Sequence, residues 1–243
     1  MPSCFCIAIY DWAIPDGTGA LNNGIKNLLL DLDEKKIAIK AEFQSGKKKK
    51  IDLTCNQEWE DISNIEEFDL NGNRLSGICY INDKKSCFRL LFLCFIGGEL
   101  FTQKASVEKL LNDLCGSGLV GYSIGFSSDD PQRALYHAMG ITFGVPVTQK
   151  QVADADRTSR FFRQTTIAQP YQRSYNICCV RGIYELNVLR IEQWKAIESA
   201  FRLKSIESMG ESRLLGEDHV LVKFDKEQAL KIDDLLLDSD VTI

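Results

Sequence analysis

The first hundred residues alternate short apolar runs with turn signals, which restricts this part of the chain to an antiparallel sheet. The linkers between the runs are too short for crossover connections, so neighbouring strands must run mostly antiparallel. The clearest turn is Asn71-Gly72-Asn73, which lies between two apolar runs as in a β-hairpin. We therefore predict a β-meander of about six or seven strands. The strand-length runs are Cys4–Trp12, Lys26–Leu32, Lys36–Phe43, Ile51–Cys55, Glu67–Leu70, Leu75–Ile81 and Cys87–Ile96.

After Phe101 the hydrophobic period changes from that of strands to that of helices. Apolar residues from Val107 to Leu114 recur at helical spacing. Asp130-Pro131 is a typical helix start, with an acid at the N-cap and proline at the first helical position. Asp225 with Gln228 resembles a capping box that opens the last helix. Further helices are predicted over Gln149–Arg163 and from Ile191 to Phe201, and strands over Val120–Phe126, Tyr175–Val180 and His219–Phe224.

This order of elements predicts an α+β protein, in which an antiparallel β-meander forms an N-terminal lobe and a mixed α/β lobe follows. We place the boundary after Phe101, with a β-rich lobe over residues 1–101 and an α/β lobe over residues 102–243. The two lobes either pack as separate units or share one core. A chain of 243 residues is long enough for either arrangement.

Composition and cysteine usage predict a cytoplasmic protein that has no membrane partner. The hydrophobic fraction of 44% and the charged fraction of 26% are those of ordinary soluble domains, and no run of eighteen apolar residues occurs. The nine cysteines are an odd count without a disulfide-framework spacing. This suits a reducing compartment, where cysteine behaves as a small buried hydrophobe. No basic region precedes the apolar residues at the N-terminus, so we expect no signal peptide.

Catalytic chemistry has few residues to draw on in this sequence. The chain has only two histidines, although histidine is the commonest general base. Most carboxylates fall at predicted turns or helix starts, where solvated tips and caps explain them. We therefore favour a protein without catalytic activity, and keep a hydrolase or transferase with a carboxylate or cysteine centre as an alternative. The residues that could form such a centre are Asp129, Asp130, His137 and Cys178.

The linear pattern predicts neither a metal nor a cofactor. Cys4 and Cys6 are too close in sequence for the usual zinc spacing and lack a second ligand pair. The adjacent Cys178 and Cys179 would point to opposite faces of a strand. Phosphate-loop, dinucleotide and zinc-protease motifs are absent from the sequence.

A window from Arg157 to Arg190 carries six arginines, no lysine and one acid, Glu185. Its net charge is 6 − 1 = +5, whereas the whole chain is −5, so the remainder sums to −10. The arginines could pair with acids elsewhere in the chain, and Asp154 and Asp156 are already at helical spacing for local pairs.

The other interpretation of this arginine window is a surface that contacts a partner. Arginine and tyrosine are enriched at interface hot spots, and arginine without lysine fits an acidic protein better than nonspecific phosphate binding. The overall charge of −5 makes a nucleic-acid partner the less favoured alternative, together with a small anionic ligand. The predicted partner-binding residues are Arg157, Arg160, Phe161, Arg163, Arg173 and Tyr175.

The stretch from Gly121 to Trp194 resembles a group of bacterial α+β proteins. It contains Gly-Tyr-x-x-Gly-Phe from Gly121, the Asp130-Pro131 helix start, an Asp/Arg helix and Gly-Ile-Tyr-Glu-Leu-Asn-Val-Leu from Gly182. This order is similar to that of immunity proteins of polymorphic and type VI secretion toxins. The resemblance covers residues 121–194 and implies a cytoplasmic, acidic, non-enzymatic protein that occludes a toxin. The favoured prediction is therefore a protein-binding module of this immunity type.

Overall fold

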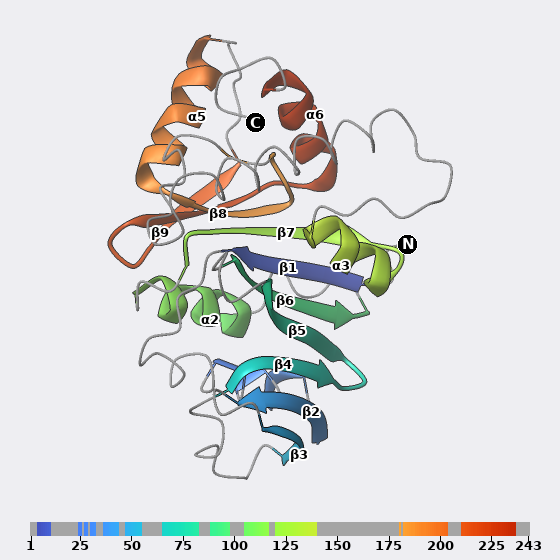
Figure 1. The fold of residues 1–243 in the computed structure, drawn as a ribbon. Coiled ribbons are helices and arrows are strands. Elements are labelled where there is room, and N and C mark those ends of the chain that lie inside the picture. Colours follow the sequence, from blue (N-terminus) through green and yellow to red (C-terminus); the bar gives the residue numbers. More distant parts are fainter. Residues whose placement is uncertain are drawn as a thin grey trace.

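The structure is a computed structural model, and it shows one large sheet with helices on both faces (Figure 1). It describes residues 4–10, 24–25, 27–28, 30–32, 36–43, 47–54, 65–82, 88–97, 105–116, 120–139, 180, 182–203 and 210–236.

Within these ranges ten strands form the sheet, in the order β3-β2-β4-β5-β6-β1-β7-β8-β10-β9, and every neighbouring pair is antiparallel. The predicted α+β class and the strand-rich N-terminal part are confirmed. The strands are β1 Cys4–Tyr10, β2 Lys36–Phe43, β3 Lys48–Thr54, β4 Ile65–Asn71, β5 Leu75–Asn82, β6 Phe88–Ile96, β7 Tyr122–Ser128, β8 Leu186–Arg190, β9 Glu211–Leu215 and β10 His219–Lys223.

The first strand lies in the middle of the sheet and joins its two halves. β1 pairs with β6 on one side and with β7 on the other, so Cys6 lies opposite both Cys94 and Phe126. All seven residues of β1 are buried. A strand that is covered on both faces needs apolar residues throughout, and this explains the continuous apolar run at the start of the chain.

Two cores fill the two faces of the sheet, and alternate residues of each central strand contribute to them. One face of β1, with Phe5, Ile7 and Ile9, packs against the helix α2 Ala105–Gly116. The opposite face of the sheet, which carries Cys4, Cys6, Ala8 and Tyr10 of β1, is covered by three helices. These are α3 Pro131–Met139, α5 Ile191–Leu203 and α6 Lys226–Leu236.

Both predicted helix caps are present. The Asp130 carboxylate accepts hydrogen bonds from the backbone N–H groups of Gln132 and Arg133, at 2.7 and 3.1 Å, and so caps α3. At the start of α6 the Asp225 side chain accepts from the Gln228 N–H at 2.7 Å. The Gln228 side chain accepts from the Asp225 N–H in return, at 3.2 Å, which is the reciprocal pair of a capping box.

The strand predicted over Lys26–Leu32 is wrong, because the described residues of this stretch are helical. The Leu32 N–H donates to the Leu28 carbonyl at 3.0 Å, as in an α-helical turn. Ile25, Leu28 and Leu32 are buried at helical spacing, whereas Leu30 is 54% exposed. The buried residues therefore follow a helical period. The stretch is too short for the sequence pattern to distinguish a helix from a strand.

Glu108 ties α2 to the far end of the sheet. Its carboxylate forms ion pairs with Arg213 of β9 and Lys223 of β10. The Glu108 side chain is only 16% exposed, so the two cations replace most of its contact with water. All three residues lie after Phe101, within the second predicted lobe, so this contact does not test the two-lobe division, which stays a prediction.

No helix within the described ranges is long and apolar enough to cross a membrane.

Candidate functional site

The six residues predicted to bind a partner lie outside the described residues, and so does Cys178. These are Arg157, Arg160, Phe161, Arg163, Arg173 and Tyr175. Of the arginine window the structure describes Arg190, at the end of β8, and the acid Glu185.

The other three predicted catalytic residues, Asp129, Asp130 and His137, line one pocket of about 360 Å³. The end of β7 and α3 form one wall of this pocket, and residues 183–185 and the start of α6 form the other. Sequence reasoning did not predict this second wall, because it comes from residues more than forty positions further along the chain.

Asp130 is engaged in holding α3 in place. Besides capping the helix, its backbone carbonyl accepts a hydrogen bond from the Ser128 hydroxyl at 2.9 Å. The same hydroxyl accepts from the Asp130 N–H at 3.3 Å. Because this carboxylate already accepts two backbone donors, its first role is structural.

His137 lies among aromatic rings at the base of the pocket. Its ring is edge-on to Phe126, with centroids 4.8 Å apart, and 5.8 Å from the ring of Tyr184. Phe126 and Tyr184 are in turn 6.0 Å apart, so the three rings form one cluster. These separations are typical of aromatic packing. They give the pocket an aromatic floor.

Glu185 fixes the second wall to β7. Its carboxylate accepts from the Ser127 hydroxyl at 2.8 Å and from the Ser127 N–H at 3.2 Å. The Glu185 carbonyl accepts from the Phe224 N–H at 2.9 Å. This acid of the arginine window therefore hydrogen-bonds a serine of β7.

Asp233 of α6 fixes the backbone of residue 183, which belongs to the second wall of the pocket. Asp233 is only 8% exposed, and its carboxylate accepts from the Ile183 N–H at 2.9 Å. The approach is close: a Cβ on Gly182 would lie 2.8 Å from the Asp233 Oδ1 atom. Glycine is therefore required at position 182 for this carboxylate to reach the backbone.

The rim of the pocket carries both signs of charge. Arg133, Lys226 and Asp129 all line the pocket and are exposed. An aromatic floor with a few polar groups at the rim is typical of a site that binds a small molecule or a side chain. The contacts of Asp130 and Glu185 give those two carboxylates a structural role in the pocket walls.

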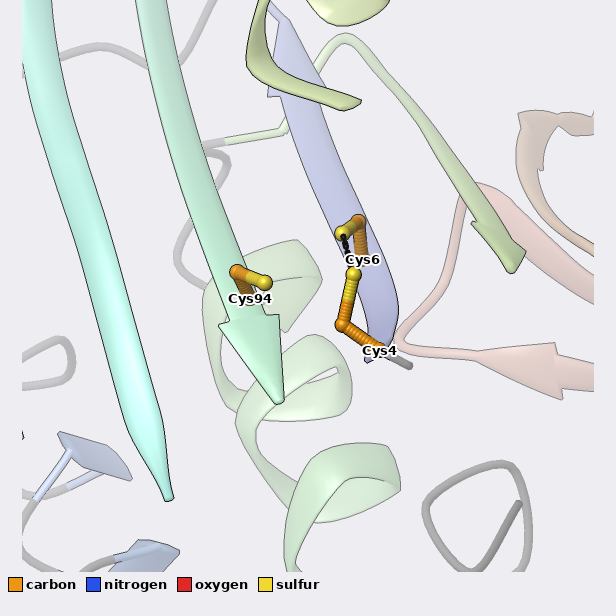
Figure 2. Close-up of side chains that lie close together, drawn as sticks. All are labelled: Cys4, Cys6 and Cys94. Atoms are coloured by element: carbon orange, nitrogen blue, oxygen red, sulfur yellow. Dashed lines mark hydrogen bonds between the residues drawn. The ribbon is translucent and has the colours of Figure 1, made fainter. Parts of the chain in front are cut away.

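A second cluster lies on the same face of the sheet and consists of three buried cysteines (Figure 2). The sulfur atoms of Cys4, Cys6 and Cys94 all lie within 4.8 Å of one another, and none is in a disulfide. Hydrogen bonding from the Cys6 thiol lowers the pKa of Cys94 to about 7. The same contact, together with burial, raises the pKa of Cys6. Among the described residues this is the group that could hold a metal ion.

Sequence spacing could not show this cluster. In the sequence Cys4 and Cys6 are too close for the usual zinc spacing and have no second ligand pair beside them. The pairing of β1 with β6 places Cys94, which is 94 − 6 = 88 positions away, opposite Cys6. The signal that would have found it is the register of these two strands.

His219 gives the structure a testable dependence on pH. The residue is buried at 6% exposure, its Nε2 atom has no hydrogen-bond partner, and burial lowers its pKa below the ordinary 6.5. The folded chain therefore binds this proton less readily than the unfolded chain does. Stability that is present above pH 6.5 should be lost as the pH falls below it, by at most about 1.4 kcal/mol per pH unit.

Urea unfolding at several pH values between 7 and 5 measures this effect. The His219→Gln variant should show a shallower loss of stability than the wild type over that range. Equal slopes for the two proteins would mean that His219 is not the group that titrates.

Comparisons with known proteins place the fold. No family model matches the chain, and a search of curated proteins found no match. One solved structure, the Pseudomonas aeruginosa T6SS protein PA0821, is similar with a TM-score of 0.57 and 11% sequence identity. The similarity covers 96% of this chain and 74% of that one. At this identity the likeness is one of fold.

Proposed function

We propose that the chain is a protein-binding component associated with a type VI secretion system, and that it acts as an immunity protein that occludes a cognate toxin. The observation that carries this proposal is the likeness in fold to a T6SS protein over 96% of the chain. It agrees with the sequence resemblance of residues 121–194 to toxin-immunity proteins. Both likenesses support a setting in type VI secretion.

Charge segregation supports the choice of contact surface. The segment from Arg157 to Arg190 carries +5 against −10 for the rest of the chain. A basic, aromatic-rich segment in an acidic protein suits an acidic partner surface.

An occluding protein of this kind works in the cytoplasm and needs no catalytic centre. In the pocket that gathers Asp129, Asp130 and His137, the best-placed carboxylate caps a helix and the histidine packs against rings. Binding is therefore the function that these contacts support best.

Reversing two arginines should break the complex while leaving the fold intact. The partner is first identified by crosslinking in the source cell, and the purified pair is then titrated by calorimetry. We expect Arg157→Glu with Arg173→Glu to weaken binding by at least about 2 kcal/mol, the threshold of an interface hot spot.

The matched control is Lys47→Glu with Lys50→Glu, which makes the same change in charge at two exposed lysines in and beside β3. This pair should bind as the wild type does. Equal affinities for the arginine and lysine variants would remove the arginine segment as the contact surface. A steep salt dependence of RNA binding would instead favour the nucleic-acid alternative.

A hydrolase or transferase remains the second candidate, because one pocket brings together three of its four predicted residues. The test is His137→Asn, assayed against panels of ester, amide and phosphate substrates beside the wild type. Turnover by the wild type that is lost in this variant would support an enzyme. Absence of turnover in both proteins would remove it.

A further inference from the structure

The pairing register of β1 with β6 brings three thiols together. Cys4 and Cys6 are two positions apart on β1 and therefore point to the same face. Cys94 lies directly opposite Cys6 on β6, so all three side chains share one space (Figure 2). All three are fully buried, at 0% exposure.

The separations fit coordination of a single ion. With a metal–sulfur bond of about 2.3 Å, two thiolates on one ion lie about 3.8 Å apart in tetrahedral geometry and about 4.0 Å apart in trigonal geometry. The Cys4 and Cys6 sulfurs are 3.8 Å apart, and no pair in the cluster exceeds 4.8 Å. The remaining gap is at most 4.8 − 3.8 = 1.0 Å, which rotations of the cysteine side chains would close.

We propose that Cys4, Cys6 and Cys94 bind one thiophilic d¹⁰ metal ion, Zn²⁺ or Cu⁺, which joins β1 to β6. Thiolates are the ligands that select these ions over Mg²⁺ and Ca²⁺. Binding requires the thiols to release their protons to solvent, so the affinity rises with pH.

Polar groups beside the cluster suit such a site. The Cys4 thiol donates a hydrogen bond to the Ser128 carbonyl oxygen at 3.3 Å, so a polar atom lies beside the three sulfurs. The Ser76 side chain hydrogen-bonds Cys94 from the neighbouring strand β5. A donor to a ligating sulfur orients it and stabilises its thiolate form.

Packing alone does not require three sulfurs at one point. Cys115 in α2 is also buried, at 6% exposure, but it lies outside the cluster and fills space in the other core. A disulfide between Cys6 and Cys94 is the competing use of this geometry, since directly paired residues on neighbouring strands can be bridged. Such a disulfide would not involve Cys4, whereas a metal ion would bind all three sulfurs.

The test uses the full chain, reduced and freed of metal under argon. Zn²⁺ is titrated in competition with a chromophoric zinc indicator, and Cu⁺ in competition with a bathocuproine chelator, so the two arms distinguish the ions. We expect one ion per chain in at least one arm, with an upward shift of Tm. Ser76→Ala should weaken binding by about 10-fold, as loss of a partner behind a ligand does.

Cys94→Val removes a ligand while keeping the site apolar and filled, and it should weaken binding by more than about 100-fold. Cys115→Val is the matched control, because it changes a buried thiol outside the cluster, and it should bind as the wild type does. Wild-type affinity in folded Cys94→Val would overturn the proposal. So would a wild type that binds neither ion, or one that forms only a Cys6–Cys94 disulfide on exposure to air.

Discussion

The Tyr10→Ala variant is expected to be about 3–5 kcal/mol less stable than the wild type, because it empties a large site in the core between the sheet and α3. Tyr10 is fully buried and stacks on Tyr122, with ring centroids 5.8 Å apart. Its hydroxyl donates to the Ala138 carbonyl at 2.9 Å. The residue thus joins the central strand to the helix that forms one wall of the pocket. Urea unfolding followed by circular dichroism measures the loss.

Tyr10→Phe separates the hydrogen bond from the packing. This variant keeps the ring and should lose only about 1 kcal/mol. Amide exchange in α3 should quicken more in Tyr10→Ala than in Tyr10→Phe, since only the former loses the packing. If the two variants were equally stable, the ring would contribute nothing, and the described packing of α3 on β1 would be wrong.

Gly125→Ala should cost about 1–3 kcal/mol, because the middle of β7 has no room for a methyl group. A Cβ there would lie 2.9 Å from the Leu186 Cβ of β8 and 2.9 Å from the Phe5 Cζ of β1. β7 lies between β1 and β8 in the sheet, so a shift at this position would disturb both neighbouring strands. Thermal and urea unfolding of the purified variant measure the cost.

A double variant tests the cause. Phe5→Leu shortens the side chain that a methyl at position 125 would meet, so the two substitutions should cost less together than the sum of their separate effects. Strict additivity would mean that the contact with Phe5 is not what excludes alanine. Gly116→Ala serves as a control, because a Cβ at Gly116 would meet nothing within 4 Å.

Local signals in the sequence predicted most elements of the fold. The apolar run ending at Ile96, the Asp130 cap and the Asp225–Gln228 box all became the predicted structures, since each depends on residues close together in the chain. The strand β9 was not predicted, because it lies at the sheet edge and four of its five residues are exposed. Such a strand carries no hydrophobic pattern to detect.

The same local signals do not predict which strands pair when they are far apart in the sequence. Nothing near Cys4 indicates that β1 inserts between β6 and β7, and the cysteine cluster depends on this insertion. Asp129, Asp130 and His137 were singled out in the sequence as possible catalytic residues, and they lie close together in the chain. Tyr184 and Glu185 were not singled out, since only the pairing of β7 with β8 brings them there.

Growth rescue tests the central claim, toxin immunity, most directly. The toxin that crosslinks to the chain is expressed in a sensitive host together with the wild type, the arginine-reversed pair or the lysine-reversed pair. Immunity predicts growth with the wild type and with Lys47→Glu/Lys50→Glu, and growth arrest with Arg157→Glu/Arg173→Glu. Continued arrest in the presence of the wild type, with the chain expressed and folded, would contradict it.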